Sequence, residues 1–556
     1  MTTIKQVCVG VAIAGAVVGA GSAVGTAVAN ADASAADSAR NEGPASPGPQ
    51  SHASRGQGGG TGKLNRSSAT AARGTGAAPT AAVRARTVRA TAAPVAAPVA
   101  AIPRPAPPSR PVLPLLSVLP TPISAAASRA TRADAVAVPF ANPTPTHVLL
   151  IGTDGTNLDK ILANPANTGF TDLMAQSVTG ATSIVGHTTI SGPSWTTILT
   201  GVWDNKSGVI NNLFNPKPYD SWPTVINQIE YYKGDDVDTA VVSDWKYIYD
   251  IGEAGGYPAN ENKYFAFNNS WADTDQQVVD YTIGLINAAA ADPNESAFIF
   301  SYQVQVDEAG HAYGGGSPEY AQAVTNVSDN IAEIMAAINA SGEDWTVIVT
   351  TDHGHQQSQG FGHGFQSPNE TSSFIIFDIA GDDSNDGKQN LGYSNTDITP
   401  TIVSLFGLPT RTDFDGVPLQ TKTSSLVTPG NLSQALLDAV HMYGYPNIGT
   451  DLALGTRTIF ASIPYFLDGF VTSVADQLQG IVDQHIFLIS ALAGVAKAVV
   501  QITGDIGVAA TQAVARVVAY LTGAGTIPPS EQPLPPPAAG SPSPVQALLL
   551  PANVVV

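Results

Sequence analysis

The chain has very little cysteine and few charged residues for its length. Its single cysteine, Cys8, lies in an apolar N-terminal stretch, and only 13% of its 556 residues are Asp, Glu, Lys or Arg. Without a second cysteine no intramolecular disulfide can form, so stability has to come from the core and from any bound metal. Histidine is also scarce, at 9 residues, which makes any local cluster of histidines informative.

The first 31 residues have the composition of a secretory signal peptide. They carry one cation, Lys5, and then a stretch rich in Ala, Val and Gly that ends in the letters ANA. Small residues after an apolar stretch are the usual cleavage pattern. We therefore expect a signal peptide over 1–31, cleaved near Ala31, and a mature protein that is secreted or held in the cell envelope.

Charge is distributed unevenly over the rest of the chain. Residues 32–146 contain 12 Lys and Arg against 4 Asp and Glu, and their abundance of Ala, Pro, Ser and Gly predicts a disordered spacer. From residue 147 onward, 12 Lys and Arg face 41 Asp and Glu. Such an acidic body repels the phosphates of nucleic acids, so no nucleic-acid binding is expected. Handling any phosphate would require bound cations.

Short apolar runs that begin at residue 147 predict buried strands. These runs span 147–155, 237–244, 297–304, 345–352 and 373–380. Between them lie stretches with apolar residues at three- and four-residue intervals, which indicate helices. Alternation of strands and helices predicts an α/β fold with a central, mainly parallel sheet flanked by helices, over a domain that we place at 147–425. Ligands of such sheets gather outside the carboxyl ends of the strands.

The C-terminal part of the chain has a different pattern. We expect a helical extension over 426–526 and a proline-rich tail over 527–556. The run 486–503 approaches the length of a membrane span, but Lys497 interrupts it and Ala and Gly dilute it. A packed or surface-lying helical hairpin is therefore expected rather than a span. The spacer or these helices could associate with the cell envelope.

Acidic and histidine residues follow the predicted strands. They are Asp154, Asp307, His311, Asp352, His353 and His363. Carboxylate and imidazole together suit a transition metal such as zinc. A loop at VDEAGHAYG could direct Asp307 and His311 at one ion, and Gly354 lets Asp352 and His353 converge at a strand end. Three carboxylates and three imidazoles suffice for two metal sites.

Ser191, in the sequence ISGPSW, is the candidate nucleophile. It precedes Gly192 and Pro193 and a helix that we expect to begin around Ser194. Free N–H groups and the positive end of a helix dipole favour both an alkoxide and a bound anion. A serine at such a place is more often a helix cap, so the assignment depends on the metal-binding residues that accompany it.

The motifs IGTDG, TTISGPSW with a following LTG, DEAGH, TDHGH and GHG, in this order, resemble those of the alkaline phosphatase superfamily. Within it, they are most similar to the type I phosphodiesterase/nucleotide pyrophosphatase family, over a segment from about 147 to 420. The resemblance implies an alkaline-phosphatase-like α/β sandwich with two divalent metal ions, expected to be zinc. It assigns one ion to Asp307, His311 and His363. It assigns the other to Asp154, Ser191, Asp352 and His353, with Ser191 as nucleophile.

The chain departs from this family around the nucleophile. Serine replaces the usual threonine, and Ser194 stands where an asparagine helps to hold the phosphoryl oxygen, whereas Asn212 is retained. We take Ser194 and Asn212 as candidate substrate-binding residues. His355 matches no required position, so it is expected to support a ligand or to face solvent, and His187 is expected to be a loop residue rather than a base.

Together these features predict an exported two-metal hydrolase of phosphodiester or pyrophosphate bonds that works through a covalent phosphoseryl or nucleotidyl-seryl intermediate. Its expected substrates are small phosphate esters such as nucleotides or lipid headgroups. A phosphomonoesterase is an alternative, which the lack of arginine beside the motifs disfavours. A sulfatase would have arginine where Trp195 stands. From another class, a non-catalytic, metal-stabilised envelope-binding protein is the remaining alternative.

Overall fold

The computed structural model describes residues 146–527, with the exception of 293, 361 and 487. All described residues belong to one compact unit of the chain. The predicted signal peptide, spacer and proline-rich tail lie outside the described residues, apart from Thr146 and Ile527.

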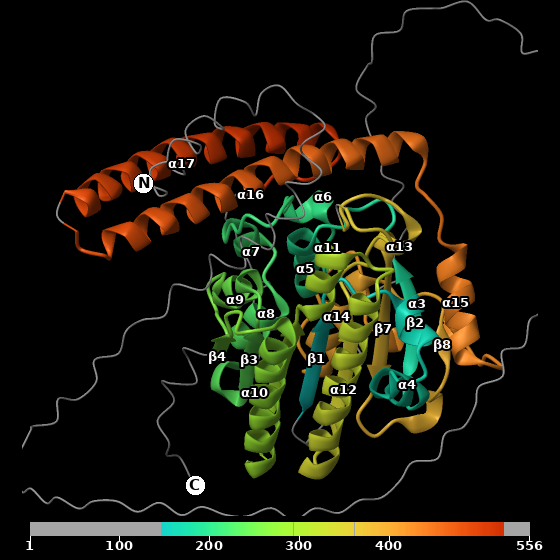
Figure 1. Ribbon diagram of the computed structural model, residues 1–556. Helices are drawn as coiled ribbons and strands as arrows, with labels where there is room; N and C mark the ends of the chain where they lie inside the picture. The colour runs from blue at the N-terminus through green and yellow to red at the C-terminus, as the bar shows by residue number, and fades with distance from the viewer. Residues whose placement is uncertain (1–145, 293, 361, 487, 528–556) are drawn as a thin grey trace, which may run out of the picture. The chain divides into compact units, whose positions relative to one another are not determined.

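A nine-stranded sheet forms the centre of the fold (Figure 1). In spatial order its strands are β4 (Glu261–Tyr264), β3 (Val237–Ser243), β5 (Ser296–Gln303), β1 (His147–Thr153), β6 (Trp345–Thr350), β7 (Ser372–Asp378), β2 (Val178–Ser183), β8 (Gln389–Asn390) and β9 (Leu426–Val427). The strands from β4 to β6 are parallel, whereas β7 is antiparallel to both of its neighbours and β9 is antiparallel to β8. The predicted mainly parallel α/β sandwich is confirmed.

The sequences of the long strands are continuous apolar runs because helices cover both faces of the sheet. On β1, Val148 and Leu150 enter one core cluster, while Leu149 and Ile151 enter the other. Successive side chains of a strand point to opposite faces, so both halves of the run are buried. The five predicted strands correspond to β1, β3, β5, β6 and β7. The other four strands are short or polar, so no apolar run in the sequence predicted them.

Helices cover the two faces of the sheet. One core cluster includes residues of α5 (Ser191–Thr200), α8 (Val225–Lys233), α9 (Lys246–Glu253) and α14 (Ile398–Leu405). The other includes residues of α3 (Leu158–Ala163), α4 (Thr168–Ala175), α10 (Trp271–Ala291), α11 (Gln305–Tyr313), α12 (Pro318–Ser341) and α15 (Leu432–Met442). Three short helices, α6 (Asp204–Ser207), α7 (Lys217–Ser221) and α13 (Pro368–Thr371), lie in the connections. Thus β9 and α15, which we expected in a separate extension, belong to the sheet and its core.

The C-terminal helices α16 (Ile448–Val482) and α17 (Ile489–Leu521) pack along each other as a hairpin. Hydrogen bonds attach its open end to the sheet domain. Asn211 Nδ2 donates to the Ala461 carbonyl and to Gln512 Oε1, both at 2.8 Å. The guanidinium of Arg457 contacts the carboxylate of Asp204. The expected helical hairpin is therefore present, and α16 reaches the part of the domain that follows α5.

Candidate active site

The predicted site residues meet at the carboxyl ends of the central strands. Asp154 follows β1, Asp352 and His353 follow β6, and Asp307 and His311 lie on α11, which starts directly after β5. Because β1 pairs in parallel with both β5 and β6, these three strand ends are neighbours. The topology thus brings together residues that are up to 199 positions apart in the chain.

A first group of possible metal ligands consists of Asp307, His311, His355 and His363. The carboxylate of Asp307 lies 3.2 Å from Nε2 of His311, 3.4 Å from Nε2 of His355 and 3.6 Å from Nε2 of His363. We expected a loop around Asp307, but the structure has a helix there. The four-residue spacing places Asp307 and His311 on the same side of α11, one turn apart, so the helix achieves the convergence that we attributed to a loop.

A second group consists of Asp154, Asp352 and His353. His353 Nε2 lies 3.2 Å from Asp352 Oδ2 and 3.6 Å from Asp154 Oδ1. The hydroxyl of Ser191 is 3.1 Å from the same Nε2. All four side chains are buried. The structure therefore places the candidate nucleophile against the second group.

Hydrogen bonds fix which ring nitrogens face the two groups. His353 Nδ1 lies 3.0 Å from the carbonyl oxygen of Gly354, and His363 Nδ1 lies 2.6 Å from that of Thr189. A carbonyl oxygen only accepts, so each Nδ1 donates and each neutral ring presents the lone pair of Nε2. These lone pairs are directed at carboxylates, an arrangement that is repulsive unless a cation lies between them.

Burial shifts the pKa values of the second group and of His363 in the first group. Burial and the charge of Asp307 raise the pKa of Asp154 to about 7. Burial and the charge of Asp154 raise the pKa of Asp352 well above its usual range. Burial lowers the pKa of His353 to about 4 and that of His363 well below its usual value, so both imidazoles are neutral at pH 7. Neutral imidazoles are the form that binds metals.

The residues of both groups fit divalent cations. In the described part of the chain, four buried side chains direct atoms without a hydrogen-bond partner toward the groups: Asp154 Oδ1, Asp307 Oδ1, Asp352 Oδ2 and His355 Nε2. Buried carboxylates without partners carry a large desolvation cost. A cation in each group would offset this cost, and a donor set of Asp and His suits zinc.

His355 lies where the sequence did not lead us to expect it. We expected it to support a ligand or to face solvent, and it is fully buried within the first group. Two glycines pack against its ring: a Cβ on Gly310 would lie 2.4 Å from the ring, and one on Gly362 would lie 2.6 Å from it. The solvent-facing alternative is therefore wrong. The signal was present in TDHGH, whose second histidine follows the first after one glycine.

Ser191 is the first residue of α5, so this helix begins three residues earlier than expected. Pro193 fits in the first turn because the N–H groups there have no partner within the helix. The Gly192 N–H donates to Asn212 Oδ1 at 2.8 Å, and a Cβ on Gly192 would lie 2.9 Å from the Asn211 carbonyl oxygen. This close approach holds Asn212 beside the nucleophile.

Two aromatic residues hold Asp154 in place. Trp195 Nε1 donates to Asp154 Oδ2 at 2.8 Å, and the hydroxyl of Tyr302 donates to the same oxygen. The other oxygen, Oδ1, is left toward His353. Trp195 thus has a positioning role that the sequence did not reveal.

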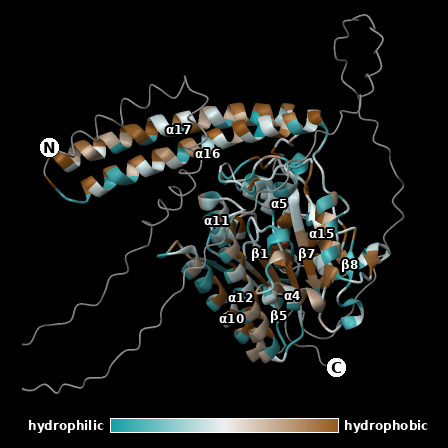
Figure 2. Ribbon diagram, turned by 45° about the vertical axis from the view of Figure 1, so that its right-hand side comes forward, coloured by the Kyte–Doolittle hydropathy of each residue, from teal (hydrophilic) through white to brown (hydrophobic). Residues whose placement is uncertain are grey.

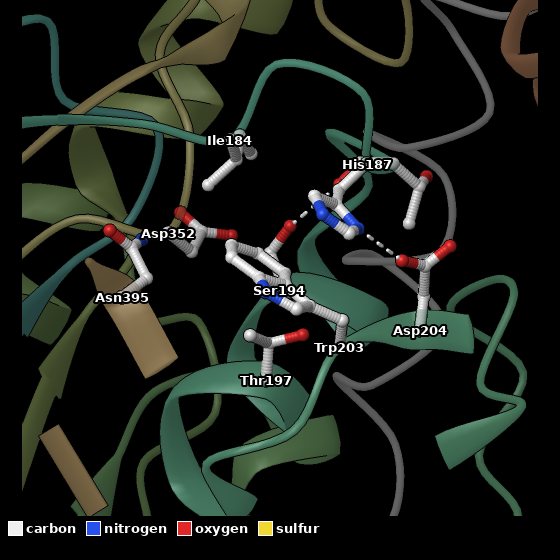
Figure 3. Close-up of a pocket in the computed structure, with 9 residues that line it drawn as sticks. Ile184, His187, Ser194, Thr197, Trp203, Asp204, Asp352 and Asn395 are labelled. Carbon is white, nitrogen blue, oxygen red and sulfur yellow. Dashed lines mark hydrogen bonds and ion pairs between the residues drawn. The ribbon is translucent and has the colours of Figure 1, made fainter. Parts of the chain in front are cut away.

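The two predicted substrate-binding residues line different cavities. Ser194 donates its hydroxyl to the Thr188 carbonyl at 3.1 Å and borders a cavity of about 10 Å³ (Figure 3). His187 lines the same cavity, and its Nδ1 lies 2.8 Å from Asp204 Oδ1. Asn212 lines another cavity, of about 50 Å³. Only Asn212 shares a pocket with residues of the first group.

This second cavity, called the site pocket below, receives part of its wall from α16. It is lined by Ile190, Asn211, Asn212, His311, His363, Gly364, Thr458, Ser462, Tyr465 and Phe466. The hydroxyl of Thr458 donates to the Gly364 carbonyl, which attaches α16 beside His363. No motif signalled this contribution, because it depends on a contact between residues 94 positions apart.

Asp, His and Ser residues thus gather at the central strand ends of a mainly parallel sheet, as the resemblance to the alkaline phosphatase superfamily led us to expect. Residues 148–368 match the family described as type I phosphodiesterase / nucleotide pyrophosphatase, which is the family that the motifs resemble. The resemblance predicted from the motifs is confirmed. The match ends at residue 368, before the C-terminal hairpin begins. The residues that α16 contributes to the site pocket therefore lie outside the matched segment.

Comparison with individual proteins gives weaker similarities. Alkaline phosphatase PhoD of Zymomonas mobilis is 32% identical over 85 residues, which are 15% of each chain, so the match spans less than a sixth of that relative. A putative sulfatase from Bacteroides thetaiotaomicron is 14% identical, with 51% of this chain and 75% of that chain covered and a TM-score of 0.40. A phosphonate monoester hydrolase from Silicibacter pomeroyi is 14% identical, with 50% and 77% covered and a TM-score of 0.37.

Proposed function

We propose that the protein is an exported hydrolase that holds two divalent cations, preferably zinc, and cleaves phosphodiester or pyrophosphate bonds. One observation carries this proposal: the hydroxyl of Ser191 lies 3.1 Å from Nε2 of His353, beside two buried groups of carboxylates and imidazoles. A hydroxyl in this position can act as the nucleophile of a two-step hydrolysis.

Asp307, His311 and His363, with His355 adjacent, would hold one cation, and Asp154, Asp352 and His353, with Ser191, would hold the other. When bound, such cations lower the pKa of a neighbouring hydroxyl and neutralise charge on the phosphoryl group. Trp195 keeps Asp154 oriented. Asn212, which accepts from the Gly192 N–H and lines the site pocket, would donate from its amide nitrogen to a phosphoryl oxygen.

In the first step, Ser191 Oγ loses its proton to solvent and attacks phosphorus. The Oγ–P bond forms as the bond from phosphorus to the leaving oxygen breaks, and the leaving group takes a proton from water. In the second step water attacks phosphorus, the Oγ–P bond breaks and Ser191 regains a proton. The positive end of the α5 dipole lies at Ser191 and favours the charged Oγ. Two inversions give retention of configuration at phosphorus.

The composition of the site pocket favours diesters over monoesters. None of its lining residues is lysine or arginine. A phosphate monoester carries nearly two negative charges at neutral pH and benefits from an extra cationic contact, whereas a diester carries one. The pocket therefore suits a singly charged phosphodiester, such as the one in a phospholipid headgroup.

The test is a comparison of three p-nitrophenyl substrates, a phosphodiester, a monoester and a sulfate, with zinc and after removal of metal by a chelator. We expect zinc-dependent hydrolysis with the highest kcat/KM for the diester. A higher kcat/KM for the monoester would assign the chain to phosphomonoesterases. Absence of hydrolysis of every ester by the zinc-loaded protein would contradict the enzyme proposal and favour a metal-stabilised binding protein.

Export and envelope association are part of the proposal. They are supported by the small-residue site at Ala31 and by the basic composition of residues 32–146. Cell fractionation followed by N-terminal sequencing should find the mature protein outside the cytoplasm, beginning near Asp32. A cytoplasmic protein that begins at Met1 would contradict export without bearing on the hydrolysis.

A further inference from the structure

The C-terminal hairpin has small residues at its interior and large apolar residues outside. Where α16 and α17 face each other, the buried residues include Ala475, Ala493 and Gly504. A Cβ on Gly504 would lie 2.4 Å from Val471 Cγ2, so the two backbones approach closely at this point. In a hairpin that folds in water, large apolar side chains would instead be directed into this interface.

Figure 2 shows hydrophobic residues, in brown, along the whole length of α17, with some hydrophilic residues between them. Its large apolar residues with 50% to 75% of their surface exposed are Ile489, Leu492, Val495, Val499, Ile502, Ile506, Val514, Val517, Tyr520 and Leu521. On α16 the corresponding exposed residues are Ile448, Leu452, Ile459, Ile463 and Phe470. Exposed apolar surface of this extent marks an interaction site.

Charged groups are directed away from this surface. On α17, Lys497 donates to Gln479 Oε1 of α16 at 2.8 Å, and Arg516 donates to the Gly208 carbonyl at 3.2 Å. Asp505 is the remaining charged residue of α17. At 100° per residue, the exposed apolar residues of α17 span about 140° of the helix circumference. A coiled-coil partner buries a narrower stripe, flanked by charged residues that select the partner.

These observations favour lipid as the occupant of the surface. Small residues between helices and large apolar residues outside are the arrangement of helix pairs in a bilayer. Both helices are long and apolar enough to cross a membrane, but only 28% and 11% of their apolar windows are buried, unlike core helices. The exposed polar residues Asp483, Gln484 and His485 at the tip disfavour crossing. A hairpin that lies along the bilayer surface with its apolar side inserted would bury the apolar residues and keep the polar tip in water.

We infer that the α16–α17 hairpin docks on a lipid bilayer and brings the site pocket to phosphodiester headgroups at its surface. The second half of this inference rests on the proposed function. Its structural basis is α16 itself, whose inner side places Tyr465 and Phe466 on the wall of the site pocket, while Ile463 and Phe470 of the same helix lie on the exposed side. Lipid binding and substrate binding thus share one helix.

The experiment is flotation of the full mature chain with vesicles of phosphatidylcholine at low and high salt. This lipid has no net charge, so the basic spacer contributes little to binding, and apolar insertion predicts vesicle binding that salt does not weaken. The test variant is Leu492→Glu combined with Ile502→Glu. The matched control is Thr472→Glu combined with Gln501→Glu, which adds the same charge to exposed polar positions of the hairpin outside its apolar faces.

We expect the test variant to lose at least about tenfold in vesicle affinity, while the control variant binds like the wild type. Both should keep their hydrolysis of a soluble p-nitrophenyl phosphodiester. For hydrolysis of the phosphodiester in the phosphatidylcholine headgroup, the test variant alone should lose at least about tenfold in rate.

Lipid docking would be contradicted if the wild type does not bind vesicles, or if both variants lose vesicle affinity equally. It would also be contradicted if the wild type forms a dimer and binds no vesicles, and if the substitutions of the test variant, but not those of the control, dissociate that dimer. The last result would assign the surface to a second copy of the chain. Vesicle binding without hydrolysis of any diester would leave docking intact and contradict the proposed function. Equal lipid hydrolysis by the test variant and the wild type would contradict the shared role of α16.

Discussion

Ser191 and Ser194 lie one turn apart on α5, yet the structure gives them different surroundings. Ser191 contacts His353, whereas Ser194 donates to a backbone carbonyl. We predict that Ser191→Ala lowers kcat at least about a thousandfold because the covalent step is lost, while zinc content, measured by mass spectrometry, stays nearly unchanged. Ser194→Ala is the matched control, with an expected loss below about tenfold. Substantial turnover by the Ser191 variant would rule out this nucleophile.

His355 places its buried Nε2 3.4 Å from Asp307 Oδ1. We predict that His355→Ala weakens zinc binding to the protein by about ten- to a hundredfold, the range found when a ligand or its immediate support is removed. The measurement is a titration against a chromophoric chelator. His187→Ala is the control, because His187 belongs to neither group and binds Asp204 instead. Unchanged zinc affinity in the His355 variant would show that this ring only fills space.

Asp244 and Asp275 form a buried acidic pair away from both groups. Burial and the proximity of Asp275 raise the pKa of Asp244 well above its usual range, and burial raises the pKa of Asp275 to about 6. The charge of Glu308 acts on Asp244 in the same direction, and Gln305 donates to Asp275. A raised pKa in the folded state means stability that is present below about pH 4 and is lost as the pH rises through about 6.

We therefore predict that Asp244→Asn, which removes one of these charges, raises the thermal midpoint at pH 8 by a few °C and changes it little at pH 4. Asp280→Asn, at an exposed position of α10, is the control and should have no pH-dependent effect. Thermal unfolding followed by circular dichroism at both pH values gives the comparison. A variant that is less stable than the wild type at pH 8 would contradict the assignment.

Most residues of the site could be predicted from sequence because each lies in a short motif directly after an apolar run. The supporting residues could not. Tyr302 contacts Asp154 from 148 positions away, and Trp195 does so from 41 positions away. His355 was in a recognised motif but has no counterpart in the family pattern. Its ring occupies the space that Gly310 and Gly362 leave open, which only the packed structure reveals.

At the scale of elements, glycine and proline misled the prediction of two helices. Gly192 and Pro193 suggested that α5 begins after them, yet both fit its first turn. Gly310 suggested a loop, yet it lies inside α11. A glycine within a helix costs about 1 kcal/mol relative to alanine, and here the close packing of His355 against Gly310 requires it. The strands were predicted well where both faces are buried and missed where they are short.

The α16 helix gives a prediction at this scale. We expect Phe466→Ala to raise KM for an aryl phosphodiester by about three- to thirtyfold, because an aromatic surface of the site pocket is lost, with a smaller effect on kcat. Phe470→Ala is the control: it lies on the same helix, is 52% exposed and is not among the residues that line the site pocket. Steady-state kinetics separates the two parameters. An equal rise in KM for both variants would point to a general disturbance of α16.

For the whole molecule, composition predicted the acidic body and the change of character at residue 147. It did not predict that the C-terminal helices meet the site, because the contacts of Arg457 with Asp204 and of Thr458 with Gly364 join distant parts of the chain. Nor did it show which side of the hairpin is apolar. That property depends on which residues the two helices bury against each other, as the pair of Gly504 and Val471 illustrates.

The position of β1 has a consequence for how the chain folds. This strand comes first in the sheet domain but lies in its middle, and its partners are β5 and β6, where His147 is paired with Ala297 and Trp345. The central ladder cannot begin to form until about 150 further residues are available, and contacts this distant in sequence make folding slow. A chain that emerges N-terminus first would remain unfolded while most of it is still being made. Such a delay would suit the proposed export, because passage through a narrow translocation channel requires an unfolded chain.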